Sequence, residues 1–245
     1  MKYVLSLILL LWTLALHAQD YRSALYQAYV HDQMDGWKEL MNRMEQEYQE
    51  RSDPKLLYEL LEAEYGYMGW LVSLKRKKEA EEILYSALRH MELLHERGLE
   101  DARVLSLKGA FFGYQIMLDP LKAPSLGKKS MEANEMAMKL DPDEPQVWLE
   151  KANMDYYRPA IFGGSKRQAL PSYEKAVGLF EASPERTREN WVYLNSLAGL
   201  GMAYENTRKY SEAGKVYRKL LDLEPSFKLV KDDLYPKFQE KHPGK

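Results

Sequence analysis

Apolar residues recur every three or four positions through most of the chain beyond residue 20. Residues 56–61 read LLYELL, and residues 213–220 read AGKVYRKL. This spacing places apolar side chains on one face of an α-helix, while the alternating β-branched runs typical of strands are nearly absent. Proline and glycine fall between the helical stretches, at Pro54, Gly98, Pro120, Pro142, Pro159, Pro184 and Pro225. The pattern predicts an all-α chain of helices joined by short turns.

The clearest repeated unit spans Leu194–Ser226 and reads LNSLAGLGMAYENTRKYSEAGKVYRKLLDLEPS. Small residues stand where two helices would cross closely, and large residues stand where successive helix pairs would meet. The positions that carry this pattern are Leu197, Leu200, Gly201, Tyr204, Tyr210, Ala213, Tyr217 and Pro225. On these residues the unit resembles a tetratricopeptide repeat (TPR), although Leu220 stands where that family usually has alanine.

Weaker copies precede this unit. Ala137 and Ala176 lie 39 residues apart, as do Pro120 and Pro159. The spacing indicates two units whose hairpin turns are about five residues longer than the usual TPR turn. An earlier unit has its first helix over residues 56–74.

The first unit is the most divergent. Helices are expected over residues 21–31 and 37–49, with a turn at Asp35-Gly36, and a tail helix is expected over 227–239. The resemblance therefore implies a right-handed α-solenoid of about five TPR-like helix hairpins followed by a C-terminal helix, similar to exported bacterial TPR proteins.

The first 18 residues have the pattern of a secretory signal peptide. Lys2 precedes an apolar run that ends before the small residue Ala18. A retained transmembrane helix is the alternative, but it needs about 20 apolar residues, and this run is shorter. We expect cleavage near Ala18, a solenoid domain over 19–245, and export to the periplasm or the extracellular space without stable membrane insertion.

Composition limits the possible chemistry. The chain has no cysteine, which excludes disulfides, thiolate metal sites and cysteine nucleophiles. It carries 35 Lys and Arg against 37 Asp and Glu, for a net charge of −2. A nearly neutral, mixed surface gives no long-range attraction to nucleic acid or anionic lipid.

The string GGSK at residues 163–166 raises the question of a phosphate-binding loop. Such a loop needs a further glycine upstream and a buried strand before it, whereas residues 145–157 have a helical pattern. We expect instead that Pro159 ends one helix, Gly163-Gly164 form the turn and Ser165 caps the next helix. Phe162 is expected to pack back into the hairpin.

No arrangement of residues indicates catalysis, a cofactor or a metal site. His90 and His95 lie five positions apart on an expected helix, do not share a face, and are interpreted as solvated surface residues. The acidic run at 141–144 lacks the spacing of a calcium loop and is interpreted as a turn before a helix N-terminus.

The resemblance implies a concave groove lined by defined positions of the first helices. On this chain those positions are Tyr65, Tyr114, Met117, Asn153, Tyr156, Tyr157, Met202, Glu205 and Asn206. Such residues combine apolar area with hydrogen-bonding tips, which suits recognition of a peptide or protein. Of these two adjacent tyrosines, we expect Tyr156 rather than Tyr157 to face the groove. The family's positions that clamp a partner's terminal carboxylate hold no cation here, because they are occupied by Leu149, Asn153, Ala198 and Met202.

The sequence therefore predicts a non-catalytic scaffold or adaptor that binds a protein or peptide partner. One alternative is a carrier of a small ligand, or a transporter-associated subunit, with the turns at 119–127 and 158–165 closing a pocket over the groove. Another is a homo-oligomer assembled through the tail around Phe227–Phe238.

Overall fold

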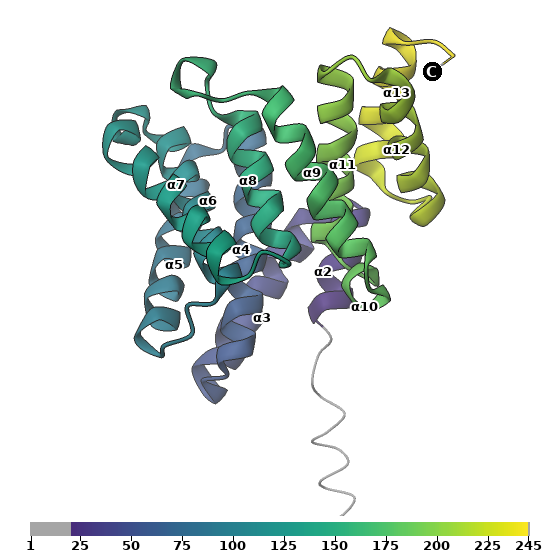
Figure 1. The fold of residues 1–245 in the computed structure, drawn as a ribbon. Coiled ribbons are helices and arrows are strands. Elements are labelled where there is room, and N and C mark those ends of the chain that lie inside the picture. The colour runs from purple at the N-terminus through teal and green to yellow at the C-terminus, as the bar shows by residue number, and fades with distance from the viewer. Residues whose placement is uncertain (1–20, 245) are drawn as a thin grey trace, which may run out of the picture.

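A computed structural model of the chain describes residues 21–244, which form an all-α solenoid (Figure 1). The predicted signal peptide lies outside the described residues. Antiparallel helices pair into five hairpins, and no strand occurs between residues 21 and 244. The hairpins are α2 (Tyr21–Val30) with α3 (Met34–Arg51), α4 (Pro54–Ser73) with α5 (Lys77–Glu96), α6 (Ala102–Leu118) with α7 (Ala123–Leu140), α8 (Pro145–Tyr157) with α9 (Lys166–Glu181), and α11 (Trp191–Asn206) with α12 (Tyr210–Leu223).

Short elements complete the chain. The 3-10 turns η1 (Pro120–Lys122) and η2 (Ala160–Phe162) lie inside the third and fourth hairpins, and α10 (Pro184–Thr187) precedes the fifth. The tail consists of a π-helix, η3 (Leu229–Leu234), and α13 (Tyr235–Lys241). The prediction of five hairpins and a C-terminal helix is confirmed, although the tail is divided at residue 234 and does not form one helix over 227–239.

Polar side chains start the first helix of most hairpins. Asp53, Asp101, Glu144 and Asn190 each accept a hydrogen bond from a backbone N–H in the first turn of α4, α6, α8 and α11. These bonds satisfy donors that have no partner within the helix. The second helices α3, α5, α7 and α12 start without a side-chain cap. The end of a hairpin at which the first helix starts therefore usually carries an acidic or amide cap, whereas the end at which the second helix starts usually does not.

Close helix crossings hold the hairpins together where the sequence has glycine. A Cβ atom added at Gly201 would lie 2.6 Å from Cε1 of the buried Tyr217, which confirms the close crossing expected in the last repeat. At Gly66 the same addition would meet the rings of Trp191 at 2.8 Å and Trp37 at 2.9 Å. These helices approach so closely because the smallest residue stands at the contact.

The tail packs on its own last hairpin. Phe227, Val230 and Phe238 are fully buried, and the ring centroids of Phe238 and Tyr217 lie 5.4 Å apart. These buried side chains are therefore not available to contact a second copy, and assembly through the exposed residues of the tail stays a prediction. The tail covers the end of the solenoid, as a terminal unit must.

Two predicted turns need correction. The first hairpin turns at residues 31–33, where Asp32 adopts φ +52°, while Asp35 and Gly36 already belong to the first turn of α3. In the fourth hairpin, Ser165 caps α9 as expected and Gly163 has φ +85°. Phe162, however, is 61 % exposed and does not pack back into the hairpin.

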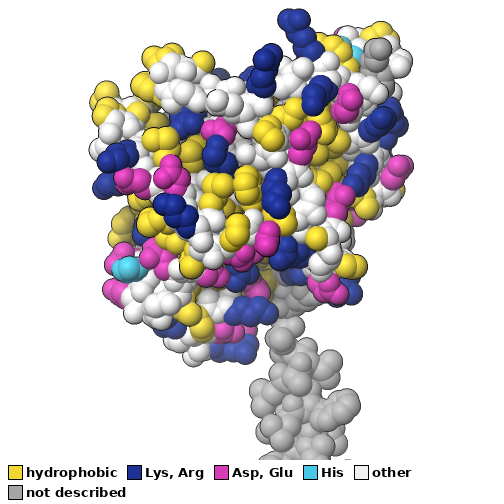
Figure 2. Space-filling model, in the orientation of Figure 1, with side chains coloured by type: hydrophobic (Ala, Val, Ile, Leu, Met, Phe, Trp, Pro, Cys, Tyr) yellow, Lys and Arg dark blue, Asp and Glu magenta, His cyan; other side chains and the backbone are white. Residues whose placement is uncertain are grey.

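Figure 2 shows the surface in the orientation of Figure 1. Acidic and basic side chains are interspersed over this face, and hydrophobic side chains extend across its middle and reach its upper edge. No helix within residues 21–244 is long and apolar enough to cross a membrane.

Candidate functional site

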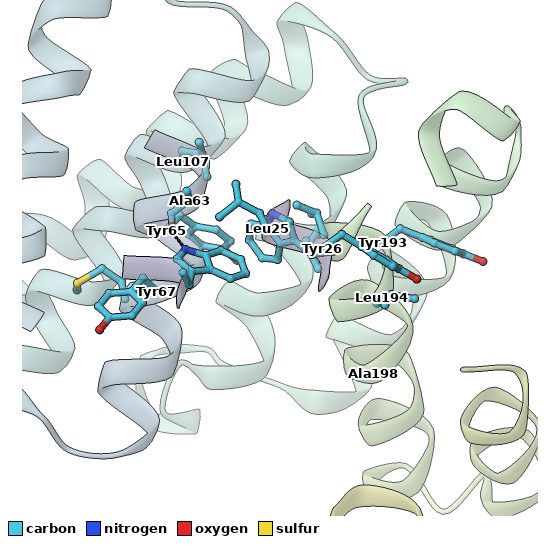
Figure 3. Close-up of a cluster of buried hydrophobic side chains, with 14 of the residues drawn as sticks. Leu25, Tyr26, Ala63, Tyr65, Tyr67, Leu107, Tyr193, Leu194 and Ala198 are labelled. Atoms are coloured by element: carbon cyan, nitrogen blue, oxygen red, sulfur yellow. Dashed lines mark hydrogen bonds between the residues drawn. The ribbon is translucent and has the colours of Figure 1, made fainter. Parts of the chain in front are cut away.

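The N-terminal helix α2 fills part of the concave side (Figure 3), where the sequence predicts a groove and leaves open whether it is closed. In Figure 3, Leu25 and Tyr26 of α2 lie between Tyr65 of α4 and Tyr193 and Leu194 of α11. Polar contacts also join the first and last hairpins. The Tyr29 hydroxyl donates to Asn195 Oδ1 at 3.3 Å, and the Arg22 guanidinium donates to backbone carbonyls of residues 185, 188 and 189.

Aromatic rings occupy the space behind α2. The ring centroid of Trp191 lies 5.1 Å from that of Trp37, 5.7 Å from that of Tyr29 and 6.3 Å from that of Tyr65. Trp191 and Trp37 are buried. This cluster joins α2, α3, α4 and α11, so the concave side is closed by packing along this stretch.

Tyr65 is consequently part of the interior. Its side chain is only 5 % exposed, so its predicted position on a groove surface is wrong. The Tyr65 hydroxyl accepts a 3.1 Å hydrogen bond from Asn153 Nδ2, and Asn153 Oδ1 in turn accepts one of 2.7 Å from the Tyr173 hydroxyl. Asn153, another predicted groove residue, is half-buried and links α4, α8 and α9.

A buried carboxylate belongs to the same network. Glu150 accepts hydrogen bonds from Gln146 Nε2 at 3.3 Å and from Asn153 Nδ2 at 3.4 Å. Its burial raises the pKa of the Glu150 carboxyl to about 7, although the hydrogen bonds from Tyr65, Asn153 and Gln146 oppose that shift. Polar side chains of α4, α8 and α9 thus form one hydrogen-bonded network inside the solenoid.

The C-terminal ends of α6 and α8 leave the predicted groove residues more accessible. Tyr114 is half-buried and donates to the Tyr65 carbonyl at 3.3 Å, whereas Met117, one turn further, is 54 % exposed. Tyr157 is 59 % exposed. Nearby protein atoms still displace water from around the Tyr157 phenol, and this desolvation raises its pKa.

Four of the predicted residues line a pocket of 530 Å³ that is open to solvent. It lies between the C-terminal ends of α8 and α11, the start of α12 and the tail, and we call it the tail pocket. Its lining residues are Tyr156, Met202, Glu205, Asn206, Arg208, Tyr210, Asp233, Leu234, Lys237, Lys241 and His242. The sequence pattern indicates the first four, but it gives no sign that the tail forms the opposite wall.

Hydrogen bonds hold one side of the tail pocket in place. Asn206 Nδ2 donates to the Tyr156 hydroxyl at 2.8 Å, and Lys166 Nζ donates to Asn206 Oδ1 at 3.0 Å. Lys166 Nζ also lies 5.2 Å from the centroid of the Tyr156 ring, a favourable cation–π position. Burial raises the pKa of Tyr156 to about 12, so its hydroxyl keeps its proton at neutral pH.

Charged groups on the other side come mainly from the tail. Glu205 Oε1 lies 3.6 Å from Lys241 Nζ and 3.7 Å from His242 Nε2, and Lys237 pairs with Asp233. Arg208 is exposed, and no side-chain ion pair of it is found within residues 21–244. The pocket therefore combines apolar walls, amide and phenol groups, and an accessible cation.

A second pocket of 510 Å³ lies on the opposite side of the last hairpin, between α2, α11 and α12. Tyr26, Glu189, Tyr193, Lys219 and Leu223 are among its lining residues. None of the predicted groove residues contributes to it.

The sequence-based interpretation of His90 as a solvated residue is wrong, because the structure buries its side chain fully. Its Nδ1 lies 2.9 Å from Glu64 Oε2, and its Nε2 lies 2.7 Å from Glu45 Oε2. Burial disfavours the charged ring, but the contacts with Glu64 and Glu45 outweigh it and raise the pKa of His90. Position 90 lies in the apolar stripe of α5 next to Met91 and Leu94. This stripe indicates burial of His90, whereas the spacing between the histidines does not.

This ion-pair cluster of His90, Glu64 and Glu45 joins α3, α4 and α5. Among residues 21–244, no group of three or more histidine, aspartate or glutamate side chains is arranged to hold a metal ion.

Comparisons with known proteins agree with this architecture. A family model described as tetratricopeptide repeat matches residues 194–227. The HusA haemophore from Porphyromonas gingivalis has a similar structure, with a TM-score of 0.60 and 18 % sequence identity over 78 % of this chain and 96 % of that chain. No match was found among curated proteins.

A thermophilic TPR protein of Thermus thermophilus is also similar, with a TM-score of 0.55 and 16 % identity over 88 % of this chain and 97 % of that chain. The family match covers the unit in which Gly201 and Tyr217 form the close crossing, and the structural similarity covers the rest of the hairpins. Residues 194–227 therefore match the tetratricopeptide repeat family, and the two solved structures share the all-α fold of the described chain.

Proposed function

We propose that this chain is an exported, non-catalytic binding protein that holds a segment of a partner protein in the tail pocket. The TPR fold supports binding of protein partners in general. The observation that carries the proposal is the pocket itself, which combines four predicted groove residues with a wall made by the tail.

The chemistry of the tail pocket suggests what it binds. Met202, Tyr210 and Leu234 offer apolar area for one or two side chains of the partner. Asn206 and Tyr156 offer hydrogen-bonding groups, and the exposed Arg208 favours an acidic group. We therefore propose an extended peptide segment that places an apolar residue beside an acidic one.

The test starts from peptides selected by display on residues 19–245 and measured by fluorescence polarisation. Met202→Ala is expected to weaken binding about tenfold, because truncation of a buried contact in a binding pocket costs about 1–2 kcal/mol. Leu223→Ala is the matched control, because it removes a similar side chain from the second pocket. Equal affinities of all three proteins would contradict the proposal.

The HusA match favours a second candidate function, carriage of haem or a similar flat, apolar molecule. HusA is described as a haemophore, and the shared fold covers 96 % of it. Tyr157 offers an accessible phenol at the end of α8, and tyrosine is one of the residue types that ligate haem iron.

Titration with haemin tests this candidate. A saturable shift of the haem absorbance band at one equivalent, lost in Tyr157→Phe, would support it. Unsaturable or identical binding to both proteins would count against it. The peptide-binding proposal predicts instead that Met202→Ala changes peptide affinity whether or not haemin binds.

A further inference from the structure

The turns inside the five hairpins lie at one edge of the solenoid and differ in charge from the turns between hairpins. Figure 1 shows the α6–α7, α8–α9 and α11–α12 turns at the top, and the α5–α6 and α9–α11 connections at the bottom. We call the first set, residues 31–33, 74–76, 119–122, 158–165 and 207–209, the hairpin-turn edge.

The hairpin-turn edge is basic. Its turns hold two acidic residues, Asp32 and Asp119, and six basic residues, Lys75, Arg76, Lys122, Arg158, Arg208 and Lys209. The connections between hairpins, residues 52–53, 97–101, 141–144, 182–190 and 224–228, hold nine acidic residues and four basic ones. Arg76 and Arg158 pair with Glu79 and Asp155 of the adjoining helices. The excess positive charge of the hairpin-turn edge therefore comes mainly from Lys75, Lys122, Arg208 and Lys209, whereas the connections between hairpins are mainly acidic.

Helix termini add to this separation. The acidic caps Asp53, Asp101 and Glu144 start first helices at the opposite edge. At the hairpin-turn edge, α3, α5, α7 and α12 start without side-chain caps, but α3, α5 and α12 carry Asp35, Glu79 and Glu212 in their first turns. An anion placed at this edge therefore meets mainly the basic side chains of the turns.

Large apolar side chains project from the same turns. Leu121 is 90 % exposed and Ile161 is 84 % exposed, and they are accompanied by Leu74 and Phe162. The upper edge in Figure 2 carries hydrophobic side chains and projecting Lys and Arg side chains. These apolar residues stand at the tips of three successive hairpins and line neither of the two pockets described above.

We propose that the hairpin-turn edge docks on the surface of an anionic lipid bilayer. Isolated apolar tips can enter the headgroup region, while Lys and Arg beside them contact lipid phosphates. A row of projecting tips fits a deformable surface better than it fits a second folded protein, which would need a complementary depression for each tip. The contact is peripheral. Arg208 belongs both to this edge and to the tail pocket, whereas Lys75, Lys122 and the apolar tips at residues 121, 161 and 162 belong to the edge alone.

Vesicle flotation tests this proposal with the chain of residues 19–245. Vesicles of phosphatidylcholine with about one third phosphatidylglycerol are expected to carry the protein, whereas pure phosphatidylcholine vesicles are not. Binding should fall as salt rises, because the charged part of the attraction is screened. The variant K75Q/K122Q should lower the partition coefficient roughly fivefold for each residue replaced.

The variant L121S/I161S/F162S should reduce binding to anionic vesicles at least tenfold, because each apolar side chain contributes by its burial. Tyr85→Ser is the control, since Tyr85 is 77 % exposed on α5 and lies outside the turns. Circular dichroism verifies that each variant is folded, and unchanged affinity for a display-selected peptide separates this result from the pocket proposal. Failure of the folded wild-type protein to float with anionic vesicles would overturn the proposal. An equal loss of vesicle binding in Tyr85→Ser would overturn it too. So would binding of the wild-type protein to a soluble acidic polymer but not to anionic vesicles.

Discussion

Replacement of Glu150 by Gln is expected to change the pH dependence of folding in a calculable way. Glu150 is 4 % exposed and lies in the network with Gln146 and Asn153. Burial raises its pKa from 4.5 to about 7 in the folded protein. The folded state therefore binds more protons than the unfolded state between these two pH values, and stability must fall as pH rises through that window.

The size of the effect follows from the shift. Each pKa unit corresponds to 1.36 kcal/mol, so this single group should lower the free energy of unfolding by roughly 2–3 kcal/mol between pH 5 and pH 8. Glu150→Gln keeps the shape and removes the titration. At pH 5 the free energy of unfolding of the variant should equal that of the wild type or lie slightly below it. At pH 8 it should exceed that of the wild type by about 2 kcal/mol.

Urea denaturation followed by circular dichroism at pH 5, 6, 7 and 8 measures this difference. Glu62, whose pKa burial also raises to about 7, and His90 add their own pH dependence, but they are present in both proteins and cancel in the comparison. A difference in unfolding free energy that stays constant from pH 5 to pH 8 would refute the reasoning, because Glu150 would then ionise as in the unfolded chain.

Two further changes test the packing. Gly201→Leu should cost about 1–3 kcal/mol or more, because even a Cβ atom there would lie 2.6 Å from the Tyr217 ring; thermal unfolding measures it, and an unchanged melting temperature would contradict the repeat register. Trp191→Ala should cost about 3–5 kcal/mol because it empties the centre of the aromatic cluster. In the latter variant α2 should become sensitive to proteolysis, and retention of full protection at residues 21–30 would contradict the role of Trp191 in closing the concave side.

The sequence predicts the architecture well where local pattern determines it. The helical spacing and the prolines indicate the hairpins, and the small Gly201 opposite the large Tyr217 indicates the last repeat because a close crossing needs that pair. The first turn is predicted in the wrong place because Asp35 and Gly36 are common turn residues. In the structure Asp35 lies in the first turn of α3, where an acidic residue is favoured.

The site is predicted less completely because it depends on contacts between distant segments. The repeat positions indicate Tyr156 and Met202, but the tail wall with Leu234 comes from packing that no local pattern specifies. In the same way, burial of Tyr65 depends on the N-terminal helix lying against α11. Net charge also conceals the separation of basic and acidic edges, which becomes apparent only when the turns are assigned to their sides of the solenoid.

Hydrogen–deuterium exchange with a display-selected peptide tests the central claim most directly, since it maps the bound surface without knowledge of the natural partner. We expect the peptide to slow exchange in residues 202–210 and 233–242, which form the two walls of the tail pocket. Exchange in the hairpin turns at 119–122 and in α4 should stay unchanged. Protection confined to those turns, or to the second pocket around residues 187–194, would contradict the account.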